Sequence, residues 1–319
     1  YESIFKARPL KLEEVNFVTS YYNQDGNHSA VTGGIGTEKL TDFSNHLELK
    51  LVGVSDWGIK HTINAGMGID HHTAASQKYI SATGASSPDG TRWYPSINWT
   101  AANEDKGFEY GLGSVISHEY NYNSVAFDGH VALKNSFGGE LNIKGSAYFD
   151  QVKMIYPSEL AASVSSQGEV QPYDQNVIKT NASRGGIIYG SGGSTYGGED
   201  NSIPSVHRNT LTGSFTYNQI IDKNSQVSFL VDVVKQDGYL ALPFHRVYFT
   251  DGTAKIESLP TTRFKLPLGV RWNYFLGDRT IIRSYFRYYS DDWGMTSQTY
   301  SLEVPYKFTP FFSIAPMYR

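Results

Sequence analysis

The sequence predicts an all-β protein: an antiparallel, up-and-down transmembrane β-barrel of about 14 strands. Three observations support this prediction. Residues 261–309 alternate apolar and polar side chains with a period of two, the polar positions carry many charges, and the chain holds 23 Tyr and 17 Phe among 319 residues. Period-two alternation indicates a strand with two different faces, and charge along a whole face favours water on that side rather than a packed core.

The segment 262–274 shows the alternation most clearly. Its two faces separate by parity, with Phe264, Leu266, Leu268, Val270, Trp272 and Tyr274 on one side and Arg263, Lys265, Arg271 and Asn273 on the other. A soluble β-sandwich would bury the first face, but it would seldom place three cations along the second. A membrane barrel has lipid on the first face and water on the second.

Composition excludes several other classes of protein. The mean hydropathy is -0.38, and no run approaches the roughly 18 to 20 apolar residues of a membrane helix. The chain has no Cys, which rules out a disulfide scaffold and a thiolate metal site. Its net charge of -4 argues against a nucleic-acid partner. No signal peptide is recognisable, so we expect a mature or partial chain.

Period-two segments predict about thirteen strands, most of them at least as long as the roughly 9 to 11 residues that a tilted strand needs to cross a bilayer. They span residues 11–22, 40–54, 60–71, 92–102, 108–120, 124–134, 139–156, 208–221, 226–238, 261–276, 279–290, 296–308 and 311–319.

The links between these strands alternate in length. Short links rich in Gly, Asn, Asp and Ser alternate with longer segments at 23–39, 72–91, 157–207 and 239–260. Among the links on the side of the longer segments, only 121–123 and 290–295 are short. Outer-membrane barrels have tight turns in the periplasm and long loops outside the cell, so we expect the long segments of this chain to face the cell exterior. An odd strand count leaves the C-terminus on the wrong side of an even barrel, so we expect a closing strand after Arg319. The whole of 1–319 is then one barrel domain, with 158–207 as a long extracellular loop.

Six segments carry a family resemblance, and they appear in the same order as in that family: 14–42, 92–99, 148–157, 242–249, 262–294 and 302–319. They resemble the outer-membrane barrel family of Gram-negative bacteria catalogued as domain-of-unknown-function family 3570. The resemblance implies a barrel in the bacterial outer membrane and a further loop and closing strand beyond Arg319. The family has no established activity. Its members are often encoded beside thioredoxin-like proteins, a small lipoprotein and a flavin transferase, which hints at envelope redox chemistry.

The wet face holds the candidate functional residues, which fall into two arcs by parity. The first seven strands carry eight acids against three bases, and strands ten to twelve carry six bases with Glu303 as the one acid. The lumen-lining candidates are Glu48, Asp70, Glu109, Glu119, Asp128 and Asp150 on the acidic arc, and Arg263, Lys265, Arg271, Arg283, Arg287, Glu303 and Lys307 on the basic arc. Such arcs would set a field across a water-filled lumen. The alternative is that the charges pair across the barrel and fill it.

Other features allow sharper hypotheses. His71 and His72 follow Asp70, but adjacent strand residues point to opposite faces, so the two cannot ligate one metal without a bend. His245 and Arg246 lie in a long loop, where they would contact an anionic solute or a lipopolysaccharide phosphate, or simply pack. Asp291 and Asp292 could chelate a divalent cation, although an acidic tight turn explains them as well.

The expected function is a passive conduit or binding barrel for a small polar or charged solute. The alternative is a structural or docking barrel for a lipoprotein or periplasmic partner. An outer-membrane enzyme is disfavoured because Ser117, His118, Asp70, His72 and Asp292 match no catalytic motif of fixed spacing. No cofactor, metal or nucleic-acid partner is expected, and the expected surroundings are outer-membrane lipid and lipopolysaccharide.

Overall fold

The computed structural model describes residues 7–25, 40–73, 89–119, 122–153, 205–241, 246–251 and 254–319. All regular structure in these ranges is β, and they contain no helix long and apolar enough to span a membrane. The strands are β1 (Arg8–Gln24), β2 (Leu40–Val54), β3 (Lys60–Thr73), β4 (Asp89–Asn103), β5 (Phe108–Glu119), β6 (Tyr122–Lys134), β7 (Gly139–Lys153), β8 (Ser205–Asp222), β9 (Ser225–Gly238), β10 (Arg246–Tyr248), β11 (Ala254–Ile256), β12 (Thr262–Leu276), β13 (Thr280–Asp291), β14 (Thr296–Glu303), β15 (Tyr306–Thr309), β16 (Phe312–Ile314) and β17 (Met317–Tyr318).

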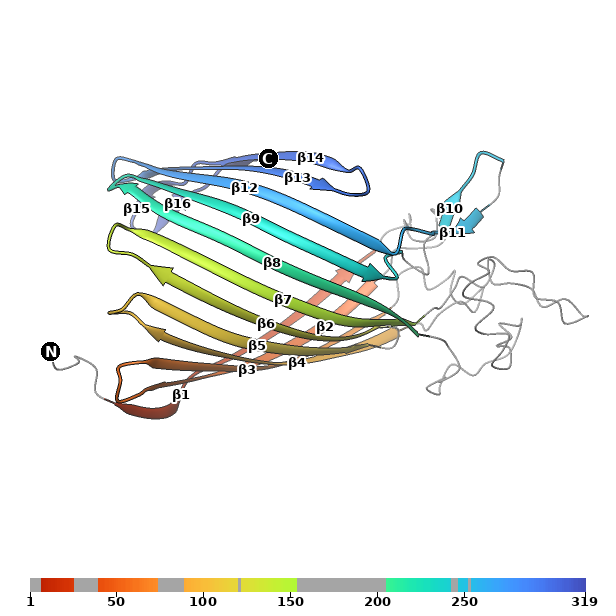
Figure 1. The fold of residues 1–319 in the computed structure, drawn as a ribbon, viewed down its shortest axis with the longest axis horizontal. Coiled ribbons are helices and arrows are strands. Elements are labelled where there is room, and N and C mark those ends of the chain that lie inside the picture. The colour runs from red at the N-terminus through yellow and green to blue at the C-terminus, as the bar shows by residue number, and fades with distance from the viewer. Residues whose placement is uncertain are drawn as a thin grey trace, which may run out of the picture.

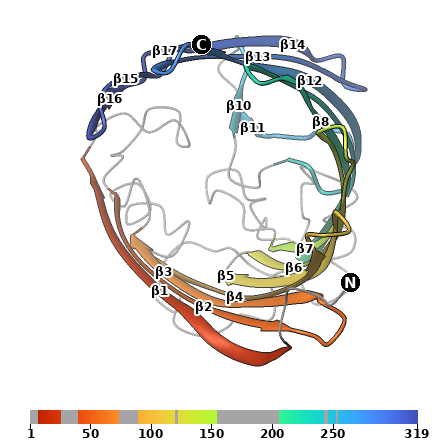
Figure 2. The same cartoon turned by 90° about the vertical axis from the view of Figure 1, so that its left-hand side faces the viewer.

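One antiparallel sheet contains nearly all of these strands, and each pairs with the next in the order β1 to β9, β12, β13, β14 and β17. Strand β15 pairs with β13 and β16, and β10 with β11 forms a separate hairpin. The long strands run side by side (Figure 1), and the sheet curls into an almost complete ring around a central axis (Figure 2). Among the described strands β1 pairs only with β2 and β17 only with β14, so a closing strand stays a prediction.

The first eleven predicted strands are confirmed, with ends that differ by at most three residues. The predicted short turns between them are confirmed as well. Gly107 and Gly138, in two of these turns, have φ values of 65° and 75°, a region that favours glycine. A Cβ on Gly107 would lie 2.9 Å from the carbonyl oxygen of Lys134, so a side chain there would meet backbone.

The last two predicted strands are each interrupted at a proline. Pro305 separates β14 from β15, and Pro316 separates β16 from β17, because proline has no N–H to donate to the ladder. Their carbonyls still accept hydrogen bonds: Ile281 N donates to Pro305 O and Val304 N to Pro316 O, both at 3.0 Å. The pairing therefore continues past each proline. The hairpin of β10 and β11, inside the segment expected to be a loop at 239–260, was not predicted.

The outward face of the sheet is apolar and exposed. Leu268 lies directly opposite Val231 on β9 and Tyr288 on β13, and Phe127 on β6 is 53% exposed on the same face. The buried apolar residues of the described part are few and mostly small, namely Val52, Ala101, Ala126, Ala132 and Ala241. A sheet that exposes its large apolar side chains and lacks a packed core fits a lipid environment.

Candidate lumen wall

Strand register places the predicted lumen residues together on the other, polar face of the sheet. On the acidic arc, Asp70 lies opposite Ser44 and Arg92, and Asp150 lies opposite Ser124 and Arg208. The register places the remaining candidates of this arc on the same face, namely Glu48, Glu109, Glu119 and Asp128. On the basic arc it does the same for Arg263, Lys265, Arg271, Arg283, Arg287 and Glu303, and Lys307 alternates with the outward Tyr306.

Side-chain contacts identify this polar face as the concave one. Arg208 on β8 donates from Nη2 to Tyr122 OH on β6 at 2.8 Å, across the intervening strand β7. His72 on β3 and Glu119 on β5 are 3.5 Å apart across β4. Neighbouring strands are about 4.8 Å apart, so side chains separated by a whole strand meet most easily where the sheet curves toward them. The polar face therefore lines the inside of the curled sheet.

The charges on this face pair along the wall, mostly with a neighbouring strand. Four pairs join Lys50 to Glu14 at 3.5 Å, Lys144 to Asp128 at 3.1 Å, Lys134 to Glu140 at 3.8 Å and Arg283 to Glu303 at 3.3 Å. His130 and Glu109 lie 3.3 Å apart. In the described part of the chain, none of these pairs crosses the lumen. The alternative of a filled, cross-barrel salt-bridge network therefore finds no support in these pairs.

The basic arc holds a second acid, which corrects the expectation that Glu303 is the only one. Asp291 lies directly opposite Lys265, and its side chain accepts a hydrogen bond from Arg263 Nε at 3.0 Å. Tyr289 OH also donates to Asp291, and the Arg263 guanidinium lies 4.3 Å from the centre of the Trp293 ring. Asp291 lies one residue beyond the predicted strand 279–290, so the sequence predicted it as part of an acidic turn, whereas the structure includes it in β13.

A similar cluster lies on β6, β7 and β8, and the sequence predicted only one of its members, Asp150. Arg208 donates to Asp150 at 3.2 Å and lies over the Tyr122 ring at 5.2 Å. Asp150 is only 5% exposed, so its carboxylate is well shielded from solvent. The alternation within 208–221 is the signal that places Arg208 on the polar face.

Polar side chains of β4 and β6 lie over glycines of β3 and β5. A Cβ on Gly68 would fall 2.1 Å from the Tyr94 ring, and Tyr94 OH donates to Asp70 at 3.0 Å. His130 covers Gly111 in the same way, and the side chains of Asn98 and Asp128 cover Gly113. Because these side chains lie against the glycine backbone of the next strand, they thicken the wall less than side chains that project inward.

The remaining candidate pairs, His71 with His72 and Ser117 with His118, do not form shared sites. His71 contacts Thr91 Oγ1 at 2.9 Å on the outward face, whereas His72 lies on the polar face near Glu119. Ser117 Oγ accepts from Arg92 at 2.9 Å, and the His118 ring is hydrogen-bonded to Asn123, so Ser117 and His118 form no hydrolytic pair.

Of the loop and turn candidates, the structure describes Asp291, Asp292 and Arg246, and of the predicted loop 158–207 it describes only residues 205–207. Both carboxylates of the acidic turn bond to protein groups, since Asp292 Oδ1 accepts from Phe264 N at 2.9 Å and Asp291 accepts from Met295 N at 3.0 Å. These bonds favour the tight-turn interpretation over chelation. Arg246 begins β10, and His245 lies outside the described residues.

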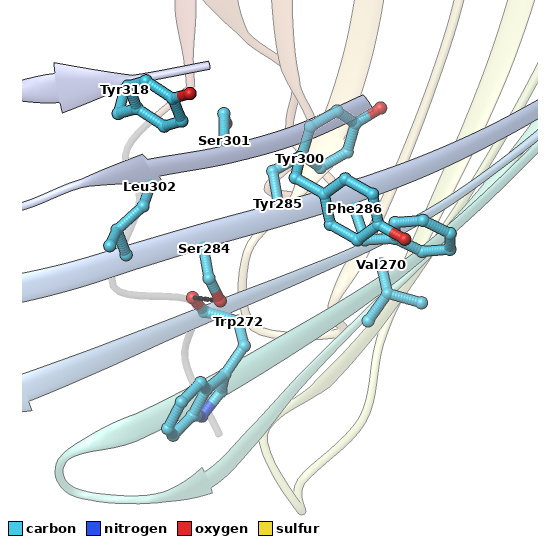
Figure 3. Close-up of a pocket in the computed structure, with 9 residues that line it drawn as sticks. All are labelled: Val270, Trp272, Ser284, Tyr285, Phe286, Tyr300, Ser301, Leu302 and Tyr318. Carbon is cyan, nitrogen blue, oxygen red and sulfur yellow. Dashed lines mark hydrogen bonds between the residues drawn. The ribbon is translucent and has the colours of Figure 1, made fainter. Parts of the chain in front are cut away.

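A hollow of about 350 Å³ lies over β12, β13, β14 and β17 (Figure 3). Ser284 is a small residue of its lining, and its Oγ donates to Trp272 O at 3.1 Å between the larger Trp272 and Leu302. Most lining residues belong to the outward face, including Val270, Trp272 and Phe286. In a membrane barrel, this surface faces lipid acyl chains.

Comparison with solved structures supports the same architecture. The chain is similar to the siderophore receptor PirA from Acinetobacter baumannii, with a TM-score of 0.50 and 9% identity over 96% of this chain and 43% of the receptor. It therefore spans less than half of that receptor. Weaker similarity extends to the COG4313 outer membrane channel from Pseudomonas putida F1, with a TM-score of 0.38 and 10% identity over 98% and 97% of the two chains. No curated protein matches the sequence.

A transmembrane β-barrel of the outer-membrane type is the class of protein that these strands, the apolar outer face and the charged inner face define. Within that class, the chain belongs to the family described as protein of unknown function DUF3570, whose model matches residues 14–319. The resemblance seen in the sequence is thereby confirmed.

Orientation is testable at the two ends of the barrel. The β10–β11 hairpin lies at the end opposite the β8–β9 turn (Figure 1). We expect Thr250→Cys in that hairpin to react with a membrane-impermeant maleimide in intact cells, and Asn224→Cys in the β8–β9 turn to react only after lysis. The chain has no native Cys, so each label reports one site. Labelling of Asn224→Cys but not Thr250→Cys in intact cells would reverse the orientation.

Proposed function

We propose that the chain forms the wall of a passive conduit for small polar or charged solutes across the outer membrane. The observation that carries this proposal is the thin inner wall, where side chains such as Tyr94 and His130 lie over glycines of neighbouring strands. A barrel of about 14 strands is wider than the roughly 8-stranded size that side chains alone fill. Flat-lying side chains in so wide a barrel favour a water-filled centre.

The charge arrangement supports the same function. Pairs such as Lys144 with Asp128 and Arg283 with Glu303 neutralise each other along the wall, so the wall needs no plug to balance them. These pairs are partly exposed to solvent, as expected for groups beside water rather than in a filled core. A charged and hydrated inner surface lowers the barrier for a polar solute and raises it for an apolar one.

Conductance of the purified protein in a planar lipid bilayer tests the conduit. We expect discrete current steps in 1 M KCl that disappear when the protein is heat-denatured before addition. A correctly folded protein, shown by heat-modifiable gel mobility, that gives no steps would refute the conduit. That result would favour the docking barrel for a lipoprotein or periplasmic partner.

A further inference from the structure

Two arginines of the inner wall are diagonal neighbours on β12 and β13. Arg271 lies directly opposite Tyr285, and the next residue pair on this face is Gly269 opposite Arg287. Diagonal side chains on adjacent antiparallel strands are about 7 to 8 Å apart or somewhat closer at Cβ, within reach of long side chains. Both guanidinium groups can therefore approach the same small volume of the lumen.

Each guanidinium is held by an aromatic ring and not by an acid. Arg271 lies 5.7 Å from the centre of the Tyr285 ring, and Arg287 lies 5.9 Å from that of Tyr289. Contact with a ring face orients the guanidinium while leaving its N–H groups able to donate elsewhere.

The carboxylates of this arc are bound to other arginines. Glu303 pairs with Arg283, and Asp291 pairs with Arg263. Across the described residues, neither Arg271 nor Arg287 has a carboxylate within 4 Å, and Asp232 on the same face of β9 lies opposite Ser214. Neighbouring like charges repel, and an anion placed between them would remove that repulsion.

Between the two arginines, the wall is formed by Gly269 and the ring of Tyr285. Gly269 is the residue directly opposite Arg287, and a Cβ there would meet the Tyr285 ring at 3.2 Å and Leu230 Cβ at 3.5 Å. The Tyr285 ring therefore lies against Gly269, as the Tyr94 ring lies against Gly68, instead of projecting straight into the lumen. The surface between the two arginines is flat, which leaves space for an anion above it.

We infer that Arg271 and Arg287 form an anion-binding station on the lumen wall, which binds the phosphate or carboxylate group of the passing solute. This inference rests on the proposed conduit and specifies its substrate class as solutes with such an anionic group. Two guanidinium groups can each donate a pair of N–H bonds to one oxyanion, a geometry that lysine cannot supply. The tyrosines keep both arginines beside the wall, so the station binds without closing the path.

Inorganic pyrophosphate is the probe for this station. In KCl, we expect pyrophosphate to reduce the chloride current of the parent protein in a saturable manner. The double variant Arg271→Gln/Arg287→Gln should raise the half-blocking concentration at least about tenfold, because it removes charge-assisted hydrogen bonds from one oxyanion. The matched control is Lys50→Gln/Lys144→Gln, which removes two positive charges from the opposite arc, and its half-blocking concentration should stay near that of the parent.

Calorimetric titration of pyrophosphate into each folded protein in detergent gives a readout that needs no conduction. Binding that is lost in the arginine variant and kept in the control supports the station, even if the parent shows no conductance and the conduit fails. Absence of binding to a folded, conducting parent overturns the station alone. Equal weakening in both double variants also overturns it, because it would assign the effect to net charge.

Discussion

Leu268→Arg is expected to prevent assembly of the barrel, whereas Arg271→Leu is expected to leave it folded. Leu268 lies near the middle of β12 on the outward face, between Val231 and Tyr288, so an arginine there would face lipid. A midplane cation on the lipid face costs roughly 2 to 4 kcal/mol in a membrane barrel. Arg271, three residues further on, is on the opposite face, where leucine removes a charge but meets no lipid.

Heat-modifiable gel mobility after refolding into lipid vesicles measures both variants. The folded fraction of Leu268→Arg should fall well below that of the parent, and that of Arg271→Leu should remain close to it. The two substitutions exchange the same residue types in opposite directions on one strand, so each controls for the other. Equal folding of both proteins would show that the two faces of β12 are assigned wrongly.

Asp150→Ala is expected to destabilise the barrel by about 3 kcal/mol. The carboxylate is almost fully buried, and its removal leaves the partly buried Arg208 without its acidic partner. Loss of one member of a buried ion pair typically costs about 3 to 5 kcal/mol, and the remaining hydrogen bond from Arg208 to Tyr122 keeps the expected value at the lower end.

Glu14→Ala is the matched comparison, since Glu14 also pairs with a cation on a neighbouring strand but is 49% exposed, and its partner Lys50 is 39% exposed. An exposed pair contributes at most about 1 kcal/mol. Urea unfolding in lipid vesicles, followed by tryptophan fluorescence, gives both free energies. A loss at Asp150 no larger than that at Glu14 would contradict the burial of the Asp150–Arg208 cluster.

Most of the fold was predictable because each strand carries its own signal. Alternation in 262–274 assigns both faces of β12 without reference to any other strand, and Gly, Asn and Asp mark the turns at the ends. The errors lie where that local signal is overridden. Pro305 and Pro316 interrupt two predicted strands, and the short β10–β11 hairpin has too few residues to show a period.

The candidate site was predictable as a face but not as a set of contacts. Parity placed Arg263 and Arg271 on the same face, yet it could not tell that Asp291 neutralises the first and that a tyrosine holds the second. Side-chain partners depend on the register between strands, and a shift of two residues keeps every face while changing every partner.

The sequence by itself therefore determined that this protein is a barrel with an apolar outer face and a charged inner face, because a period of two is a property of each strand alone. Only the tertiary structure decided which charged side chains have an oppositely charged partner. Asp150 meets Arg208 across 58 residues of sequence, and Arg271 is left beside Arg287 without an acid in the described chain. Those contacts follow from strand pairing. The separation of two residues in the sequence does not show whether strand pairing will bring them together.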